Sequence, residues 1–423
     1  MKNYVEYIEN LKTLISYKTV AAPAEENAPF GKENLKALHF FLDLAKSFGF
    51  ETINYDNYAG EIYYGEGEEI GIVGHLDVVP TGISWETDPF TLTLKDGYYY
   101  ARGIIDDKAP TLLCLYALKE LKDSGVKVNK KFRLFVGCNE ETGWKDIDYV
   151  STKTKMPYYG FSPDGNFPVS YAEKGVTNAY FELPLLKNFF GLKAGTVINA
   201  VCDYACVNAT ENGINKKLLE KYGLKLKDGN VIESYGKAAH SSTPHLGRNA
   251  LKPLFEYFLD MGENVKDVLD YLFYDKGGIS EMENEQGVLT SSPDLAEEKN
   301  GKIIIAVNYR IPAPLTRNDL IAVLDKFGFK YTIIEQHEPV MVEKDGWFVQ
   351  TMLNAFNTVR GEKAVPISMG GSTFARAFKQ GCAFGPVIKT YETNCHDANE
   401  RIKETDLLAA YEIYKATIFG LAK

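Results

Sequence analysis

Hydrophobic residues recur with helical spacing in two stretches near the N-terminus, at residues 5–18 and 35–48, and predict two amphipathic helices. The pattern then changes to a short run rich in β-branched residues at 69–74, which is typical of a buried strand. A further helical pattern covers residues 110–121, and the apolar run at 131–138 indicates a second buried strand. Strand, helix and strand in this order predict an α/β layer with parallel pairing.

The middle and the end of the chain have different patterns. Residues 302–310 alternate as in a half-buried strand, whereas the polar segment at 292–301 predicts a loop. Two more amphipathic helices are expected at 346–359 and 406–419.

These patterns predict an α/β protein of two domains. The first domain is discontinuous, is formed by residues 1–176 and 345–423, and is expected to contain a mixed, mainly parallel sheet flanked by helices. The second domain, residues 177–344, is expected to be an inserted α+β domain. The length of 423 residues is consistent with this division, since a domain takes about 150 residues.

Composition narrows the class of protein. Hydrophobic residues make up 45% and charged residues 25% of the chain, which is the balance of a globular protein. Lys and Arg number 47 against 57 Asp and Glu, so the net charge is −10. This charge argues against binding to nucleic acid or to anionic membranes, because both attract basic proteins. No run approaches the roughly 18 apolar residues of a transmembrane helix.

Two further features indicate the cytoplasm. The first ten residues, M-K-N-Y-V-E-Y-I-E-N, lack the apolar segment of a signal peptide. The six cysteines form no C-x-x-C pair and are few for the length, as is typical of reduced thiols. We therefore expect a cytoplasmic protein.

Candidate chemistry begins at the end of the first strand, where the sequence reads Gly-His-Leu-Asp. His75 and Asp77 are two residues apart, so on a strand they share a face and can act together. A histidine that binds a metal ion usually donates its other ring N–H to a carboxylate, and Asp77 is placed for that task. Taken alone, such a pair is more often structural.

More carboxylates and a second histidine follow in the first domain. Adjacent carboxylates repel one another unless a cation lies beside them, and the chain has such pairs at 106–107 and 140–141. Asp164 lies in a turn sequence, and His396 lies near the end of the chain. Each alone is explained as a helix cap, a solvated charge or a turn residue. Together they suit two divalent cations, whose charge three carboxylates and one hydroxide would balance.

The order of these motifs resembles one group of enzymes. The segments are G-H-L-D-V-V-P, R-G-I-I-D-D-K, N-E-E-T-G, F-S-P-D-G, G-K-A-A-H-S-S-T-P and C-H-D-A-N-E. They resemble the co-catalytic zinc peptidase superfamily that includes glutamate carboxypeptidase, aminoacylase, carnosinase and the succinyl-diaminopimelate desuccinylases. Over essentially its whole length, the chain is most similar to bacterial dipeptidases of the peptidase V type. The resemblance implies that the first domain is catalytic and that the insert is a lid.

The resemblance also implies a set of metal ligands. His75 and Asp164 would bind one ion, Glu141 and His396 would bind the other, and Asp106 would bridge the two.

Two further roles in the first domain follow from the same resemblance. Glu140 would be the general base, and Asp77 would orient His75. The family usually has a cis peptide bond after the bridging aspartate, which predicts one between Asp106 and Asp107.

The lid residues that match the family are expected to contact the substrate. His240 matches a histidine that polarises the scissile carbonyl, and Asn199 matches an asparagine near the reacting group. Arg310 matches an arginine that binds the C-terminal carboxylate, a task that suits its planar guanidinium. Gly370 and Gly371 lie in a turn whose backbone N–H groups can meet the same carboxylate. The chain departs from the family in two places: no proline follows Asn199 within three residues, and a serine replaces a third glycine in the turn.

The activity implied is hydrolysis of short peptides with free N- and C-termini, by water activated between two metal ions and a glutamate general base. Hydrolysis of N-acyl amino acids by a deacylase or desuccinylase of the same superfamily stays open, and so does a relative that binds without catalysis. Zinc is the expected metal, with manganese or cobalt as alternatives. The long insert indicates a lid that completes the site within one chain, so we expect a monomer.

Overall fold

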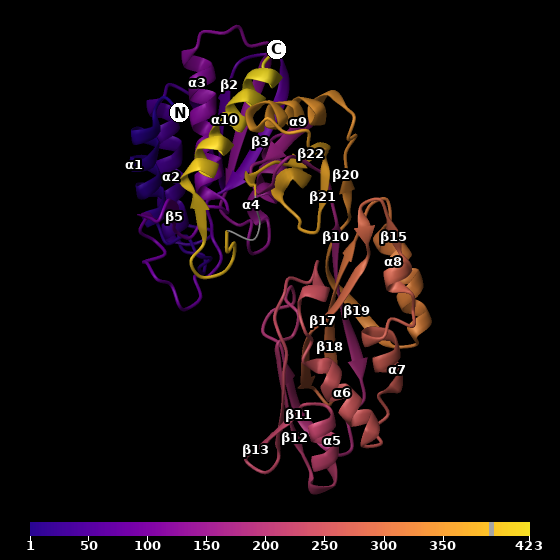
Figure 1. Ribbon diagram of the computed structural model, residues 1–423. Helices are drawn as coiled ribbons and strands as arrows, with labels where there is room; N and C mark the ends of the chain where they lie inside the picture. The colour runs from indigo at the N-terminus through magenta and orange to yellow at the C-terminus, as the bar shows by residue number, and fades with distance from the viewer. Residues whose placement is uncertain (389–392) are drawn as a thin grey trace. The chain divides into compact units, whose positions relative to one another are not determined.

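The computed structural model describes residues 1–388 and 393–423, and the chain forms two compact units (Figure 1). Unit 1 consists of Met1–Tyr171, Val342–Ile367 and Thr373–Lys423, and unit 2 consists of Ala172–Met341 and Ser368–Ser372.

The expected domain boundaries lie close to the limits of these units. The sequence places them at 176/177 and 344/345, whereas the units change at 171/172 and 341/342. One short segment differs, because Ser368–Ser372 belongs to unit 2 rather than to the unit that holds the rest of the C-terminal part. Its contacts give the reason: Ser368 Oγ donates to the carbonyl oxygen of Gln286 in unit 2 at 3.1 Å. The roles of the two domains stay predictions.

Unit 1 is built on a mixed sheet with the strand order β1-β2-β6-β3-β7-β22-β9. The central strands β6, β3, β7 and β22 pair in parallel, and the outer pairs are antiparallel, which confirms the mixed α/β fold. The parallel pair β3–β6 with a helix between its strands is also confirmed. The strands are β1 (Glu51–Tyr55), β2 (Ala59–Tyr64), β3 (Glu68–His75), β6 (Lys130–Gly137), β7 (Tyr159–Ser162), β9 (Ser170–Glu173) and β22 (Gln380–Ala383).

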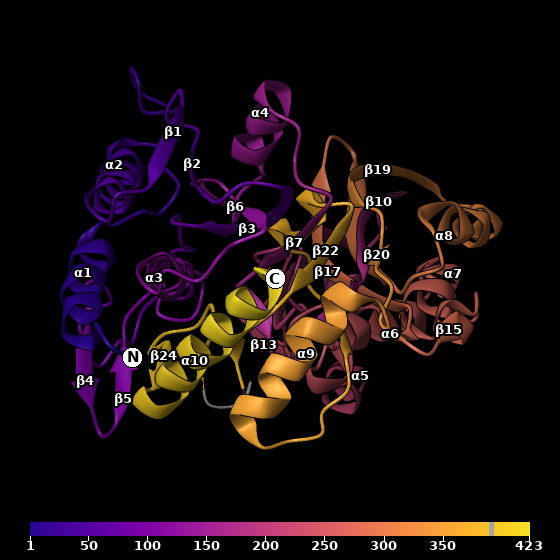
Figure 2. The same ribbon diagram turned by 90° about the horizontal axis from the view of Figure 1, so that it is seen from above.

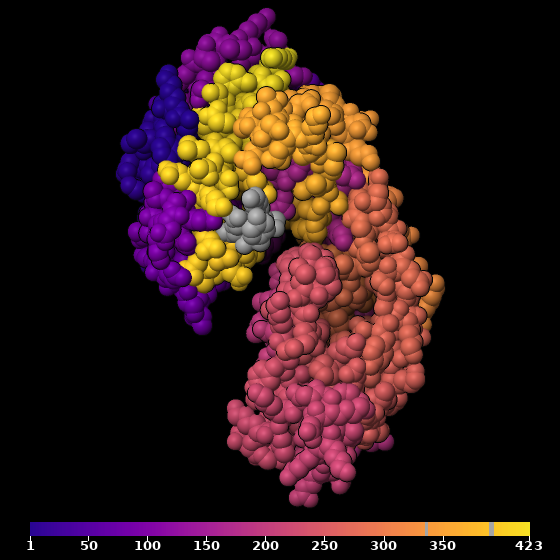
Figure 3. Space-filling view, in the orientation of Figure 1, coloured from indigo at the N-terminus to yellow at the C-terminus, as the bar shows by residue number. Residues whose placement is uncertain are grey.

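Helices cover both faces of this sheet. On one face, α3 lies between α1 and α10, and α9 packs against α10 (Figures 1 and 2). The surface of unit 1 shows α9 in orange beside the yellow C-terminal segment (Figure 3). The helices of the unit are α1 (Tyr4–Ser16), α2 (Lys32–Ser47), α3 (Lys108–Asp123), α4 (Lys145–Lys153), α9 (Trp347–Arg360), α10 (Glu404–Leu421) and the short η6 (Phe374–Ala377).

The opposite face of the sheet packs against α4 and η6. Val73 and Phe135, on the parallel strands β3 and β6, form an apolar cluster with Ile147, Val150 and Phe374. Because successive side chains of a strand alternate between faces, the neighbouring Ile72 and Leu134 point to the side of α3 and are also fully buried. A sheet buried on both faces explains the continuous apolar runs that predict β3 and β6.

Two small sheets complete unit 1. One contains β4 (Thr93–Lys95), β5 (Tyr98–Tyr100) and β24 (Arg401–Lys403), and the other pairs β8 (Gly165–Asn166) with β23 (Pro386–Val387). The antiparallel pair β5–β24 is relevant to the site, because it fixes the C-terminal segment that precedes β24 beside the segment that follows β5.

Unit 2 is an antiparallel sheet with helices, which confirms the expected α+β class. Its strand order is β13-β14-β12-β11-β17-β18-β10-β19. The strands are β10 (Gly175–Leu183), β11 (Phe189–Ala194), β12 (Tyr204–Ala209), β13 (Lys225–Lys227), β14 (Val231–Tyr235), β17 (Thr290–Lys299), β18 (Lys302–Ile311) and β19 (Lys330–His337). Short pairs are formed by β15 (Glu283–Asn284) with β16 (Gly287–Val288), and by β20 (Val340–Met341) with the end of β9, while β21 (Ile367–Met369) also pairs with β9.

One face of this sheet carries the core of unit 2. Alternate residues of β18, namely Ile303, Ile305 and Val307, are buried with Leu254 and Phe258 of a covering helix. The helices are α5 (Lys216–Lys221), α6 (Leu251–Asp260), α7 (Lys266–Val268) and α8 (Arg317–Leu324), with the short turns η1 (Glu211–Gly213), η2 (Pro244–Leu246), η3 (Leu269–Phe273), η4 (Ile279–Glu281) and η5 (Asp325–Phe327).

The predicted loop at 292–301 is wrong, because most of this segment belongs to β17. The strand pairs with β11 and β18 and therefore lies inside the sheet. A bulge at Asp294 shifts the register and interrupts the alternation by which a strand is identified from sequence. Only Asn300 and Gly301 form the turn into β18.

In the part of the chain that the structure describes, none of the helices combines the length and the hydrophobicity needed to span a lipid bilayer.

Candidate metal centre and substrate-binding residues

Strand ends bring the chemistry-bearing residues of unit 1 together. His75 is the last residue of β3, Glu140 and Glu141 follow the end of β6, and Asp164 follows the end of β7. These three strands are parallel neighbours, so their carboxyl ends meet at one edge of the sheet. Asp106 reaches the same edge from the segment that leads into α3.

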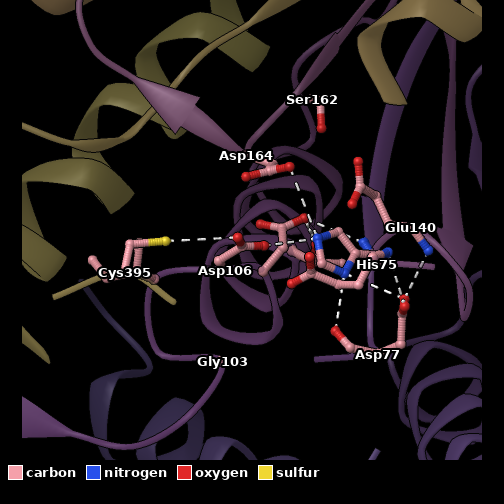
Figure 4. Close-up of polar contacts among 12 residues, drawn as sticks. His75, Asp77, Gly103, Asp106, Glu140, Ser162, Asp164 and Cys395 are labelled. Carbon is pink, nitrogen blue, oxygen red and sulfur yellow. Dashed lines mark hydrogen bonds and ion pairs between the residues drawn. The ribbon is translucent and has the colours of Figure 1, made fainter. Parts of the chain in front are cut away.

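The first group of possible ligands is His75, Asp106 and Asp164, whose ligand atoms all lie within 4.8 Å of one another. His75 Nε2 lies 2.8 Å from Asp106 Oδ1 and 3.8 Å from Asp164 Oδ2. In Figure 4 the side chains of Asp106 and Asp164 both point toward the imidazole. The sequence predicted these three residues together.

The second group is Asp106, Cys395 and His396, which meet the same 4.8 Å limit. His396 Nε2 lies 2.8 Å from Asp106 Oδ2 and 3.4 Å from Glu141 Oε1. Asp106 therefore presents one carboxylate oxygen to each of two imidazoles, as a bridging ligand does. Cys395 was not among the residues predicted from the sequence.

Unsatisfied buried atoms show that this arrangement fits metal ions. Among the described residues, His75 Nε2, Asp106 Oδ1 and Glu141 Oε1 are buried without a hydrogen-bond partner. The approach of His75 to Asp106 is short but lacks hydrogen-bond geometry. Donors bound tetrahedrally about 2.0–2.1 Å from one ion would lie roughly 3.3 Å apart, which is close to the observed separations. Imidazole and carboxylate donors are those that zinc, manganese and cobalt accept.

The chain around His75 fixes the position of its ring. His75 is fully buried, and its Nδ1 lies 3.0 Å from the carbonyl oxygen of Asp77 and 3.4 Å from Asp77 Oδ1. Its backbone N–H donates to Asp107 Oδ2, which also accepts from Thr111 Oγ1 at 2.7 Å. The preceding residue must be glycine, because a Cβ at Gly74 would lie 1.8 Å from Thr111 Oγ1. The peptide bond between Asp106 and Asp107 is cis, as predicted.

Asp77 also ties the histidine to the glutamate pair. Its Oδ1 accepts the backbone N–H of Glu140, and its Oδ2 accepts that of Glu141, both at 3.1 Å. One buried carboxylate therefore connects the segment after β3 with the segment after β6. The turn behind the pair is held by Asp146, whose Oδ2 accepts the backbone N–H of Cys138 at 2.6 Å.

Burial and like charge dominate the electrostatics of the carboxylates. Burial raises the pKa of Glu140 well above its usual value, and neighbouring carboxylates such as Asp164 add to this against the opposing effect of His75. Burial also raises the pKa of Asp164, and the charge of Asp106 adds to it. Asp106 differs, because despite its burial the imidazoles of His396 and His75 hold its pKa well below the usual range. Burial opposes a charge on the two imidazoles, but Asp106 and Asp77 raise the pKa of His75, and Glu141 and Asp106 raise that of His396.

Sequence reasoning missed a second buried connection. Glu400, which closes the tail motif, forms an ion pair of 2.6 Å with Arg102, and both side chains are at most 1% exposed. Its Oε1 accepts the backbone N–H of Ile105 at 2.8 Å and that of Asp106 at 3.4 Å. Both residues stand in motifs that the sequence shows, but no local signal connects residues that lie almost 300 positions apart.

The predicted lid residues gather within unit 2. Asn199 and His240 lie on neighbouring segments, because Ala200 pairs with His240 in an isolated bridge and Ser241 N donates to the carbonyl oxygen of Asn199 at 3.0 Å. His240 is exposed, and its Nδ1 lies 2.6 Å from Ser242 Oγ.

Arg310 and the glycine-rich turn belong to the same part of unit 2. Arg310 is buried, donates from Nε to Asn308 Oδ1 at 2.8 Å, and donates from Nη1 to the carbonyl oxygen of Gly370 at 3.3 Å. Gly370 also lies against the histidine segment, since a Cβ there would be 2.5 Å from Ser242 Cβ. Gly371 follows in the same turn. The sequence predicted Arg310, Gly370 and Gly371, whereas Asn308 and Ser242 are additions from the structure.

The fold and the buried cluster of imidazoles and carboxylates define an α/β protein built to bind metal ions. Residues 71–419 match the peptidase family M20/M25/M40, and the chain belongs to this family. The Beta-Ala-Xaa dipeptidase of Lactobacillus delbrueckii subsp. lactis is 33% identical over 438 residues, which cover 95% of this chain and 92% of that protein. YtjP of Bacillus subtilis (strain 168) is 32% identical over 438 residues, covering 96% and 94%.

Solved structures with low identity show the same fold. Human carnosine dipeptidase 1 gives a TM-score of 0.61 at 14% identity, covering 99% of this chain and 97% of that chain. The M20 family metallo-carboxypeptidase Sso-CP2 of Sulfolobus solfataricus gives a TM-score of 0.62 at 16% identity, with 98% of both chains covered.

Proposed function

We propose that the protein is a metal-dependent dipeptidase that hydrolyses short peptides with free N- and C-termini. The observation that carries this proposal is Asp106, whose two oxygens each lie 2.8 Å from a different imidazole. Its support also includes the name of the Lactobacillus relative, a Beta-Ala-Xaa dipeptidase that matches nearly the whole chain.

We assign the ligands in two sets around the shared aspartate. His75, Asp106 and Asp164 would hold one divalent ion, and Asp106, Glu141 and His396 would hold the other. When bound, such ions polarise the scissile carbonyl and lower the pKa of the attacking water. Asp77 would keep the His75 ring in place through its contacts at Nδ1.

Glu140 is the proposed general base. Its neighbour Glu141 faces His396, whereas the structure gives the carboxylate of Glu140 no imidazole contact among the described ion pairs. Glu140 would take the proton from the attacking water and pass it to the amine that leaves when the C–N bond breaks. Its raised pKa suits a group that must both accept and donate a proton.

The residues of unit 2 are proposed to bind the substrate. Arg310 would bind the C-terminal carboxylate with its guanidinium, and the N–H groups of Gly370 and Gly371 would bind the same group. His240 would polarise the carbonyl, and Asn199, on the paired segment, would lie near the reacting group. The contacts of Arg310 and Ser242 with Gly370 support these assignments, because they place the residues in one part of the unit.

Three finer points belong to the same proposal. We propose zinc as the metal, because imidazole and carboxylate donors suit it, with manganese and cobalt as alternatives. We propose a monomer and a cytoplasmic protein; all six cysteines are free thiols, which supports a reducing compartment. Sedimentation of the active protein tests the proposed monomer. Activity that requires two chains would contradict it.

Hydrolysis by metal-stripped protein reloaded with zinc or manganese tests the function. The substrates are free dipeptides, a tripeptide, dipeptide amides and N-acetyl amino acids. Metal-dependent cleavage of dipeptides, with little cleavage of amides or acetylated compounds, is the expected result. Preference for N-acetyl amino acids would replace the proposal with a deacylase, and no turnover with two ions bound would leave a binding protein. Asp106→Asn should abolish binding of both ions, whereas Asp123→Asn, at the end of α3, is the matched control.

A further inference from the structure

Cys395 differs from the other five cysteines of the chain. It is the exposed one of the six, whereas Cys114, Cys138, Cys202 and Cys382 are buried. Its thiol points toward Asp106 and donates a hydrogen bond to Asp106 Oδ2 over 3.7 Å (Figure 4). A thiol placed simply to fill space would be expected in the core.

The surroundings of the sulfur indicate a cation. Asp106, Cys395 and His396 present an oxygen, a sulfur and a nitrogen within 4.8 Å of one another. One buried carboxylate oxygen on this side of the site, Glu141 Oε1, lies 3.4 Å from His396 Nε2 and has no hydrogen-bond partner among the described residues. A separation of 3.7 Å suits two donors of one ion, because zinc–sulfur bonds of about 2.3 Å are longer than zinc–oxygen bonds.

We propose that Cys395 Sγ is a ligand of the ion bound by Asp106 and His396. On binding, the thiol releases its proton to solvent and the sulfur donates an electron pair to the ion. This inference rests on the proposed function, since it adds a donor to the metal site assigned there. It makes the two ion positions chemically different, because the first set, His75, Asp106 and Asp164, contains no sulfur.

A thiolate ligand would give one of the two ion positions a preference among metals. Thiolate is a soft ligand and favours zinc or cobalt over manganese, which prefers oxygen donors. The protein should therefore bind zinc at the Asp106–His396 position more tightly, relative to manganese, than a variant without the thiol does. Zinc can add a fifth ligand, so the extra donor leaves access for water.

Cobalt spectroscopy on the full chain tests the assignment. Metal-free protein is titrated with Co²⁺, and the near-ultraviolet charge-transfer absorption of a cobalt–thiolate bond is recorded for wild type, Cys395→Ser, Cys395→Ala and Cys206→Ser. Cys206 is the matched control, because it is partly exposed and belongs to unit 2. The band is expected in wild type and Cys206→Ser and absent from both Cys395 variants. Competition between zinc and manganese should show the preference for zinc reduced at least tenfold in Cys395→Ala.

The outcomes separate this inference from the proposed function. Absence of the band in cobalt-loaded wild type, or its persistence in Cys395→Ala, overturns the inference. Dipeptide hydrolysis by the same samples is measured in parallel. An active wild type without the band retains the function and refutes the ligand, whereas an inactive wild type with the band retains the ligand and refutes the function.

Discussion

The buried ion pair between Arg102 and Glu400 allows a prediction about both stability and metal binding. Glu400→Gln removes the negative charge and keeps one carbonyl oxygen in place. Both side chains are at most 1% exposed, so the guanidinium would be left charged in the interior. Removing one partner of such a pair costs about 3–5 kcal/mol, and we expect about 3 kcal/mol because Arg102 keeps its contacts with the carbonyl oxygens of Pro80 and Asp397.

The double variant Arg102→Met/Glu400→Gln is expected to recover part of this loss. Burial raises the pKa of Glu400 even though Arg102 opposes it, so we expect the intact pair itself to be costly to bury. Removing both charges should therefore cost less than the two single changes together, with a coupling energy of about 2–3 kcal/mol. Metal affinity should fall in Glu400→Gln, because the single amide oxygen cannot accept both from Arg102 and from the backbone N–H groups of Ile105 and Asp106.

Tryptophan fluorescence in a urea titration measures the effect in the relevant unit. The three tryptophans, Trp85, Trp144 and Trp347, all belong to unit 1, so the signal reports unfolding of that unit. Glu9→Gln is the control, because Glu9 pairs with Lys12 on an exposed surface and should change the free energy of unfolding by at most about 0.5 kcal/mol. A loss below about 1 kcal/mol in Glu400→Gln, or strict additivity in the double variant, would refute this reasoning.

Three further changes test other residues. Glu140→Gln should lower kcat by roughly 10²–10⁴-fold while calorimetry still finds two ions per chain, since the proposed proton carrier is lost and no proposed ligand is; unchanged kcat would exclude Glu140 as the base. Arg310→Lys should lower kcat/KM for free dipeptides by about 10–100-fold and leave slow cleavage of dipeptide amides unaltered, because charge-assisted hydrogen bonds are worth about 1.5–3 kcal/mol; equal losses on both substrates would contradict carboxylate binding. Burial raises the pKa of Asp294 to about 8, although hydrogen bonds from the hydroxyls of Ser241 and Ser292 oppose this shift. The folded state therefore keeps the Asp294 proton at pH values where the unfolded chain has lost it. Relative to Asp294→Asn, the free energy of unfolding of wild type should fall by about 1.4 kcal/mol per pH unit as the pH rises to about 8. Denaturant titrations at pH 6 and pH 8 measure this difference, and a gap that does not change with pH would contradict it.

Elements with a clear hydrophobic period could be predicted from the sequence. The runs that predict β3 and β6 lie within one residue of the observed strands, because both strands are buried on two faces and consist of apolar residues. β17 could not be predicted in this way, since its buried positions include Ser292 and Asp294, and the bulge breaks the alternation. A polar strand inside a sheet is specified by its neighbours, which only the tertiary structure brings together.

The residues of the site also fall into those that the sequence could predict and those that it could not. Residues whose type matches a familiar motif, such as His75 and Asp106, could be assigned from the sequence, and the structure brings them into contact. Cys395 and Glu400 could not, although both belong to the motif C-H-D-A-N-E. Their importance depends on contacts with the segment around Asp106, at separations of 289 to 298 residues, and no local pattern carries that information.

The carboxylates of the metal centre are costly to the fold unless cations are present. Burial raises the pKa of Glu140, Glu141 and Asp164, so each resists ionisation in the folded state. Divalent ions would reverse this effect, because they favour the ionised form of every carboxylate that faces them. Ion binding is therefore linked to the stability of unit 1, and the gain grows with ion concentration as for any ligand of the folded state. The same residues that would prepare the protein for catalysis would then make its fold depend on the metal.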